Sequence, residues 1–116
     1  MQRIMCKSKV YGIRITNKVV EYEGSIELSS EVLDKAEILP GEMVIVVNMN
    51  NGERFNTYAV RGKPGECVLL GGAARLGEIG DKLIIISCAI MSTDEAKMHS
   101  PKMLTVDKNN KLKAKI

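Results

Sequence analysis

The chain contains few aromatic side chains and no strong concentration of positive charge. Its 116 residues include no tryptophan, one phenylalanine and three tyrosines, and its formal net charge is +3. The lysines and arginines are scattered except in residues 108–115, and a basic tail of this kind is usually just solvated. Because binding of single-stranded nucleic acid needs aromatic stacking platforms, the composition predicts that nucleic acid is not a partner.

Long apolar runs are also missing. No stretch of 18 or more apolar residues occurs, and residues 1–7 lack the apolar segment of a secretory signal. We therefore expect a cytoplasmic protein without a membrane partner. A chain of this length can bury about two-thirds of its unfolded surface in one compact domain without disulfides.

Motifs for disulfides and metal ions are absent as well. The three cysteines, Cys6, Cys67 and Cys88, are odd in number and show no CxxC spacing. The sequence thus predicts no disulfide framework, no metal site and buried thiols. The single histidine, His99, lies near Pro101 in a predicted surface segment, so we do not expect it to be catalytic.

What the sequence does contain is a succession of short strand-like segments. Turn signals such as Asn51-Gly52 and residues 62–65 separate them. The predicted strands cover residues 10–16, 20–28, 43–47, 54–60, 67–70 and 82–90, with residues 102–106 and 112–116 as a final hairpin. Many short strands at close spacing indicate a small closed or nearly closed barrel, which leaves no exposed edges.

Local patterns refine this prediction. Residues 43–47 are rich in β-branched side chains, which indicates a strand buried on both faces, and the Asn-Gly turn predicts that it pairs with residues 54–60. Ser29-Ser30 can cap a short helix that ends at Pro40-Gly41, and residues 94–98 favour a second one. The inward-facing residues expected in the first helix are Val32, Leu33 and Ala36.

The most informative feature is the Gly24-Ser25 pair, which lies inside a strand-like alternation. Over residues 20–28 the even positions are mostly apolar and the odd ones mostly polar. A glycine in a strand suggests a bulge or a close backbone approach. From there the Ser25 hydroxyl can reach back to the Gly24 carbonyl, which is how self-cleavage of a backbone begins.

A second polar group lies on the predicted strand 54–60. Side chains alternate along a strand, so Arg54, Asn56 and Tyr58 share one face, with Arg54 and Tyr58 about 13 Å apart. Thr57 points to the other face. Strand geometry alone therefore does not bring these groups together.

Several ordered motifs together carry a family resemblance. They are Glu23-Gly24-Ser25, the run from Asn51 to Tyr58, and Gly72-Ala73-Ala74-Arg75 followed by Gly80-Asp81. The chain resembles the pyruvoyl-dependent aspartate 1-decarboxylases over almost its whole length. The resemblance implies a mainly β, six-stranded double-psi β-barrel with short helices, assembled as a homotetramer with active sites between neighbouring subunits.

By this resemblance the protein makes its own cofactor. The Ser25 hydroxyl attacks the Gly24 carbonyl, the peptide becomes an ester, and elimination then breaks the chain. Hydrolysis of the resulting dehydroalanine leaves a pyruvoyl group at residue 25. The expected products are a β chain of residues 1–24 and an α chain of residues 25–116.

The resemblance also assigns a reaction and a set of site residues. L-Aspartate forms a Schiff base with the pyruvoyl group, which is derived from Ser25, loses CO2 and leaves as β-alanine for pantothenate and coenzyme A biosynthesis. Lys9 and Arg54 hold the carboxylates, and Tyr58 donates the proton. The remaining residues are Thr57, for substrate binding and polarisation of the scissile carbonyl, Tyr22, for positioning of the cleavage point, and Gly72, Ala73 and Ala74, for backbone contacts to substrate.

The chain departs from the family pattern at three places. Gly71 stands where relatives usually carry asparagine, in a loop one residue shorter, while Tyr11 replaces a frequent histidine and Val47 a bulky aromatic residue. Two alternatives stay open at this point. One is a non-cleaving paralogue that acts as a partner or regulatory subunit, and the other is a non-enzymatic barrel that binds nucleic acid through the basic tail.

Overall fold

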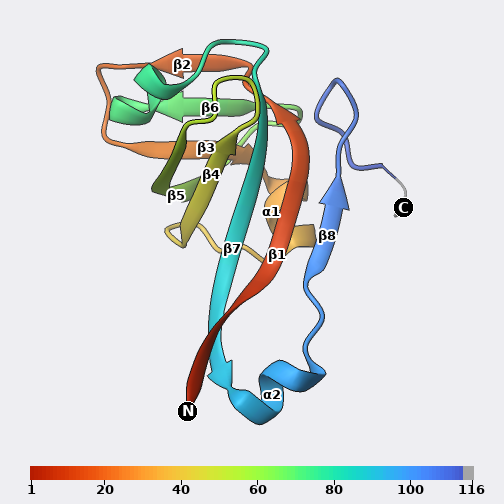
Figure 1. The fold of residues 1–116 in the computed structure, drawn as a ribbon. Coiled ribbons are helices and arrows are strands. Elements are labelled where there is room, and N and C mark those ends of the chain that lie inside the picture. The colour runs from red at the N-terminus through yellow and green to blue at the C-terminus, as the bar shows by residue number, and fades with distance from the viewer. Residues whose placement is uncertain (114–116) are drawn as a thin grey trace.

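The computed structural model describes residues 1–113 of the chain. These residues form eight strands, two α-helices and one 3₁₀ helix (Figure 1). In chain order the elements are β1 (Gln2–Arg14), β2 (Asn17–Val19), β3 (Ser25–Ser29), α1 (Ser30–Ala36), β4 (Met43–Asn48), β5 (Arg54–Gly62), β6 (Cys67–Leu70), η1 (Gly71–Leu76), β7 (Lys82–Ser92), α2 (Thr93–Met98) and β8 (Lys102–Thr105). None of these helices combines the length and the apolar composition that crossing a bilayer requires.

The strands form one curled, barrel-like sheet. The strand order is β2-β6-β3-β5-β4-β7-β1-β8. The chain itself links the two sides of the sheet. β2 follows directly after β1 in the sequence, but it pairs with β6 at the opposite side of the sheet. At this junction the Thr16 N–H donates to the Cys67 carbonyl at 2.8 Å, and the Cys67 N–H donates to the Thr16 hydroxyl at 3.0 Å. The prediction of a mainly β, barrel-like fold is confirmed.

The strand count differs from the six implied by the family resemblance. Six strands, from β6 to β1 in the sheet order, make up the body of the sheet. The short strands β2 and β8 lie at its two ends and bring the total to eight. At the lower end of Figure 1, β1 and β7 continue beyond the other strands as a two-stranded arm that ends beside α2.

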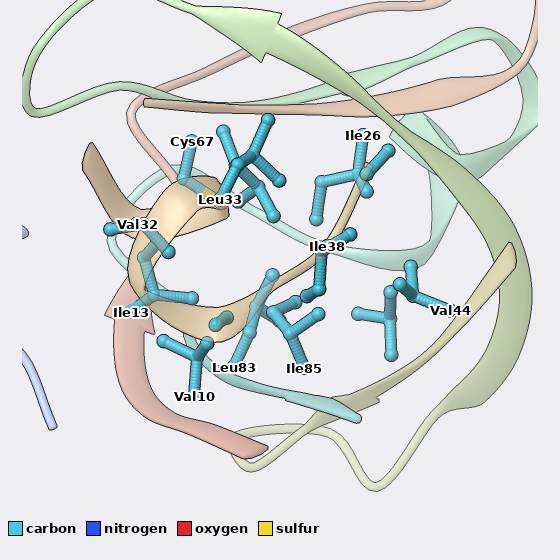
Figure 2. Packing of buried hydrophobic residues seen from close by; sticks show 14 of the residues in the cluster. Val10, Ile13, Ile26, Val32, Leu33, Ile38, Val44, Cys67, Leu83 and Ile85 are labelled. Atoms are coloured by element: carbon cyan, nitrogen blue, oxygen red, sulfur yellow. The ribbon is translucent and has the colours of Figure 1, made fainter. Parts of the chain in front are cut away.

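The core lies inside the curled sheet and is closed by α1. Ser29 caps this helix, since its hydroxyl accepts the Val32 N–H at 3.3 Å. Val32 and Leu33 are buried among side chains from the surrounding strands (Figure 2). The predicted helix is confirmed, but it ends at Glu37, which adopts the left-handed conformation with φ of 57°, before the Pro40-Gly41 pair is reached.

The prediction of a strand over residues 20–24 is wrong. Val20 and Tyr22 are exposed, and β3 begins only at Ser25. Ser25 pairs with Leu70, the last residue of β6, after which the chain turns into η1. Residues before Ser25 therefore have no β6 partner, and an alternating pattern without a partner strand does not make a strand.

Burial on both faces of the strand at residues 43–47 is also wrong. In β4, Val44 and Val46 are buried, while Met43 is 61% exposed and Ile45 and Val47 are only partly buried. The run of β-branched residues reflects strand propensity here and not burial on both faces. The predicted hairpin of β4 with β5 is confirmed by their antiparallel pairing.

Three further differences concern the ends of elements. β1 begins at Gln2 and not at residue 10, and the predicted loop after residue 70 forms the 3₁₀ helix η1. The predicted C-terminal hairpin is reduced to a single bridge between Val106 and Leu112, because β8 pairs in parallel with β1 instead. Residues 114–116 of that hairpin lie outside the described residues.

The cysteines differ in exposure. Cys67 is buried in β6, and burial raises the pKa of its thiol to about 12, so this thiol is inert at neutral pH. Cys88 is exposed on the outer face of β7, and Cys6 opposite it on β1 is partly buried. The prediction of buried thiols is therefore confirmed for Cys67 and wrong for Cys88.

Candidate active site

The sheet brings Ser25 to the strand that carries Thr57 and Tyr58. β3 runs parallel to β5, with Ile26 opposite Ala59. Extending this register back by one residue sets Ser25 level with Tyr58. β6 flanks β3 on its other side. Ser25 is therefore held at the start of a strand that has hydrogen-bonded neighbours on both sides.

Exposure changes sharply at the bond between Gly24 and Ser25. Tyr22 is 62% exposed and Gly24 is exposed, whereas Ser25 is only 2% exposed. A Cβ built on Gly24 would meet no atom within 4 Å. The bond thus joins an open surface loop to a buried strand.

Gly71 touches this loop directly. It adopts φ of +71°, and a Cβ there would lie 2.7 Å from both the Gly24 Cα and the Tyr22 carbonyl oxygen. Distances this short exclude any side chain unless the backbone moves. The glycine that the sequence marks as a departure from its family is therefore the residue that lets the corner between β6 and η1 pack against residues 22–24.

The η1 helix follows from this corner. Gly72 is exposed, Ala73 is partly buried, and the Ala74 side chain is buried in the core. All three residues follow Gly71 within about one helical turn, and Gly71 itself contacts the loop at Gly24. Their backbone is therefore close to the loop that ends at Gly24, while the Ala74 side chain serves packing.

The far end of η1 is fixed by Asn48, which the sequence reasoning missed. This fully buried side chain donates to the Leu76 carbonyl at 3.2 Å and to Asp81 Oδ2 at 2.9 Å, and its oxygen accepts the Asn50 N–H at 2.8 Å. The Asn48 hydrogen bond, followed by one from the Glu78 N–H, lowers the pKa of Asp81. The sequence signal that could have identified Asn48 is its position, as a polar residue that ends a run of β-branched residues.

Lys9 and Arg54 share the outer face of the sheet but do not meet. Across β1, β7, β4 and β5, in that order, one row of register partners consists of Lys9, Ile86, Ile45 and Asn56. The next row on the same face consists of Tyr11, Ile84, Val47 and Arg54. Three strand spacings separate β1 from β5, which is about 14 Å. On the convex outside of a barrel, side chains diverge. One chain alone therefore does not direct Lys9 and Arg54 at one small molecule.

The alternation predicted for β5 is present. Arg54 and Asn56 are exposed and Tyr58 is partly buried on the outer face, while Thr57 is 9% exposed and points inward. The fold thus collects Gly24, Ser25, Thr57 and Tyr58 at one end of β3, with Gly71 beside them. Two predicted site residues lie apart from this group, Lys9 on β1 and Arg54, which is four residues from Tyr58 along β5.

Comparison with known proteins identifies the family of the chain. The family profile described as aspartate decarboxylase matches residues 1–113. The chain belongs to the aspartate decarboxylase family. Relatives named aspartate 1-decarboxylase include those of Thermoanaerobacter pseudethanolicus, 48% identical over 113 residues (96% of this chain, 97% of the relative), Kosmotoga olearia, 48% over 112 residues (95%, 96%), and Chlorobium limicola, 46% over 112 residues (95%, 88%).

The close contact between Gly71 and the Gly24 backbone predicts how a side chain at position 71 would change the stability of this family member. Gly71→Ala places a Cβ against the Gly24 backbone at a positive φ, so we expect a clear fall in melting temperature, corresponding to about 1 kcal/mol or more. Gly72→Ala is the matched control, because a Cβ at Gly72 meets open space. Equal melting temperatures for the two variants in thermal unfolding would refute the contact.

Asn48 supports a second prediction. Asn48→Ala removes a buried side chain that makes several hydrogen bonds and leaves the Leu76 carbonyl without this donor, so we expect a loss of about 1–3 kcal/mol in unfolding free energy. Asn56→Ala, an exposed amide on β5, should change stability by less than about 0.5 kcal/mol. Urea unfolding of both variants measures this, and a loss no larger for Asn48→Ala than for Asn56→Ala would contradict the anchoring role.

Proposed function

We propose that this protein converts Ser25 into a pyruvoyl group and then decarboxylates L-aspartate to β-alanine and CO2, as a step toward pantothenate. The observation that carries the proposal is the Gly24-Ser25 bond, which passes from an exposed loop into the buried start of β3 beside Thr57 and Tyr58. Membership of the aspartate decarboxylase family supports the reaction.

The proposed processing uses groups that the chain already holds. The Ser25 hydroxyl attacks the Gly24 carbonyl carbon, which exchanges the peptide for an ester. Elimination releases Gly24 as a carboxylate, and hydrolysis of the remaining dehydroalanine releases ammonia. The absence of a Cβ on Gly24 favours attack, and Thr57 on the adjacent strand is the residue assigned to polarise the carbonyl. Tyr22, two residues before Gly24, would position the loop.

The two products are expected to stay together after cleavage. Residues 1–24 contain β1, which is paired with β7 on one side and β8 on the other, and β2, which is paired with β6. Residues 25–116 contain those three partner strands. Cleavage therefore breaks one covalent bond but removes no strand from the sheet.

The residues around Ser25 fit a pyruvoyl group at this position. Ser25 is buried at the start of β3, and in this proposal the backbone of Gly72, Ala73 and Ala74, which follow β6, would lie beside it. The pyruvoyl group would supply an electron sink for the carbanion left by the departing CO2. Tyr58, level with residue 25, would donate the proton to that carbon.

Recognition of L-aspartate requires two cations. Arg54 lies on the same outer face of β5 as Tyr58 and offers a bidentate guanidinium. Lys9 of the same chain lies three strands away, on β1, so we assign the second cation to Lys9 of a neighbouring subunit. This assignment requires a homotetramer with active sites between subunits, and the partly exposed apolar residues beside Lys9 would form the interface. They are Ile45, Val47, Ile84 and Ile86.

Activity measurements on three variants test the proposal. Ser25→Ala should stay one intact chain and produce no β-alanine, whereas Tyr58→Phe should cleave normally and lose about 10²–10⁴-fold in kcat. Ser100→Ala, an exposed serine in the segment between α2 and β8, should match the unmodified protein. Normal turnover by Ser25→Ala would exclude the mechanism, and an unchanged kcat in Tyr58→Phe would exclude Tyr58 as the proton donor.

A further inference from the structure

A cationic cavity lies between the ends of β1 and β7 and the segment that follows β8. Its volume is about 540 Å³, within the range of small-molecule sites. Four positively charged side chains line it, namely Arg14, Lys82, Lys108 and Lys113. None of the residues that form the proposed active site lines this cavity.

The positive charges are not neutralised by the described residues. The ion pairs recorded within residues 1–113 involve Lys7, Lys18, Arg61 and Lys102, and none of the four cavity cations. Arg14 and Lys82 are also register partners on adjacent antiparallel strands. Like charges directly opposite each other destabilise a sheet. The molecule therefore carries a repulsion at this position that a bound anion would relieve.

The one carboxylate that lines the cavity, that of Asp107, already accepts hydrogen bonds from two backbone N–H groups. Asp107 Oδ1 accepts the N–H groups of Asn109 at 2.8 Å and Lys111 at 3.0 Å. The Lys111 N–H is the main cause of its lowered pKa, followed by the Asn109 N–H. Four positive groups against this one negative group leave a net charge of +3 around the cavity.

A hydroxyl group without a partner lies in the same wall. Thr105 lines the cavity, and its Oγ1 is the buried side-chain oxygen or nitrogen for which residues 1–113 supply no hydrogen-bond partner. A buried polar group left in this state costs free energy. Because this oxygen has almost no exposed surface even with the cavity empty, the cations and not this hydroxyl are the groups that a ligand meets.

The wall is preformed. The buried Asn110 side chain accepts the Arg14 N–H at 2.8 Å and donates to the carbonyl oxygens of Arg14 at 2.9 Å and Gly65 at 3.0 Å. These bonds fix the segment after β8 to the end of β1. A ligand would therefore enter without the cost of ordering the loop.

We propose that this cavity binds a small molecule through a phosphoryl group. A phosphoryl group carries nearly two negative charges and three strong acceptor oxygens, which matches several cations better than a single carboxylate does. Tyr11 also lines the cavity and lies two positions from Lys9 on β1, so the site adjoins the Lys9 end of the outer face.

Calorimetric titration with inorganic phosphate and pyrophosphate at constant ionic strength tests this. We expect saturable binding with one site per chain, weakened about tenfold or more in Lys82→Met. Lys63→Met, an exposed lysine in the turn between β5 and β6, should leave binding unchanged. Phosphate should also raise the melting temperature of the unmodified protein but not of Lys82→Met.

The unliganded variants add a second readout. Without phosphate, Lys82→Met should melt above the unmodified protein, because the repulsion with Arg14 is gone. The proposal is overturned if neither anion binds saturably, if Lys63→Met and Lys82→Met weaken binding equally, or if citrate binds as tightly as pyrophosphate and loses affinity equally in Lys82→Met. The first two results would leave only diffuse attraction of counter-ions, and the third would make this a carboxylate site.

Discussion

The hydrogen bonding of β3 on both sides, beginning at Ser25, is the constraint on which the candidate site depends. β5 holds one edge and β6 the other, while the residue before Ser25 is already in an exposed loop. A single peptide bond therefore separates a rigid, buried serine from an accessible glycine. This arrangement suits intramolecular attack on a backbone carbonyl, since the nucleophile is held in place directly after a residue that has no side chain.

The packing around this bond depends on small residues. The corner after β6 lies so close to the loop that Gly71 admits no side chain. Replacement of the usual asparagine by glycine therefore has a steric basis in this chain and does not by itself indicate a lost activity. Asn48 fixes the other end of η1, so this helix is held at both ends against the loop before β3 and the turn before β5.

The sequence predicts those parts of the fold that local chemistry determines. The Asn51-Gly52 turn identifies the β4–β5 hairpin, and the Ser29 cap identifies α1. The alternation of polar and apolar residues fails as a signal where strand formation depends on a partner strand. Residues 20–24 alternate like a strand, but they extend past the end of β6 and have no partner there. The grouping of Ser25 with Tyr58 follows from parallel pairing, and the separation of Lys9 from Arg54 follows from strand order. Neither can be read from residue spacing.

The most direct test of self-processing at Gly24 and Ser25 is the intact mass of the purified protein under denaturing conditions. The account predicts two species that together span the 116 residues, one ending at Gly24 and the other lighter by one ammonia than a chain starting with Ser25. A single species with the mass of the uncleaved chain, in a preparation that decarboxylates L-aspartate, would contradict it.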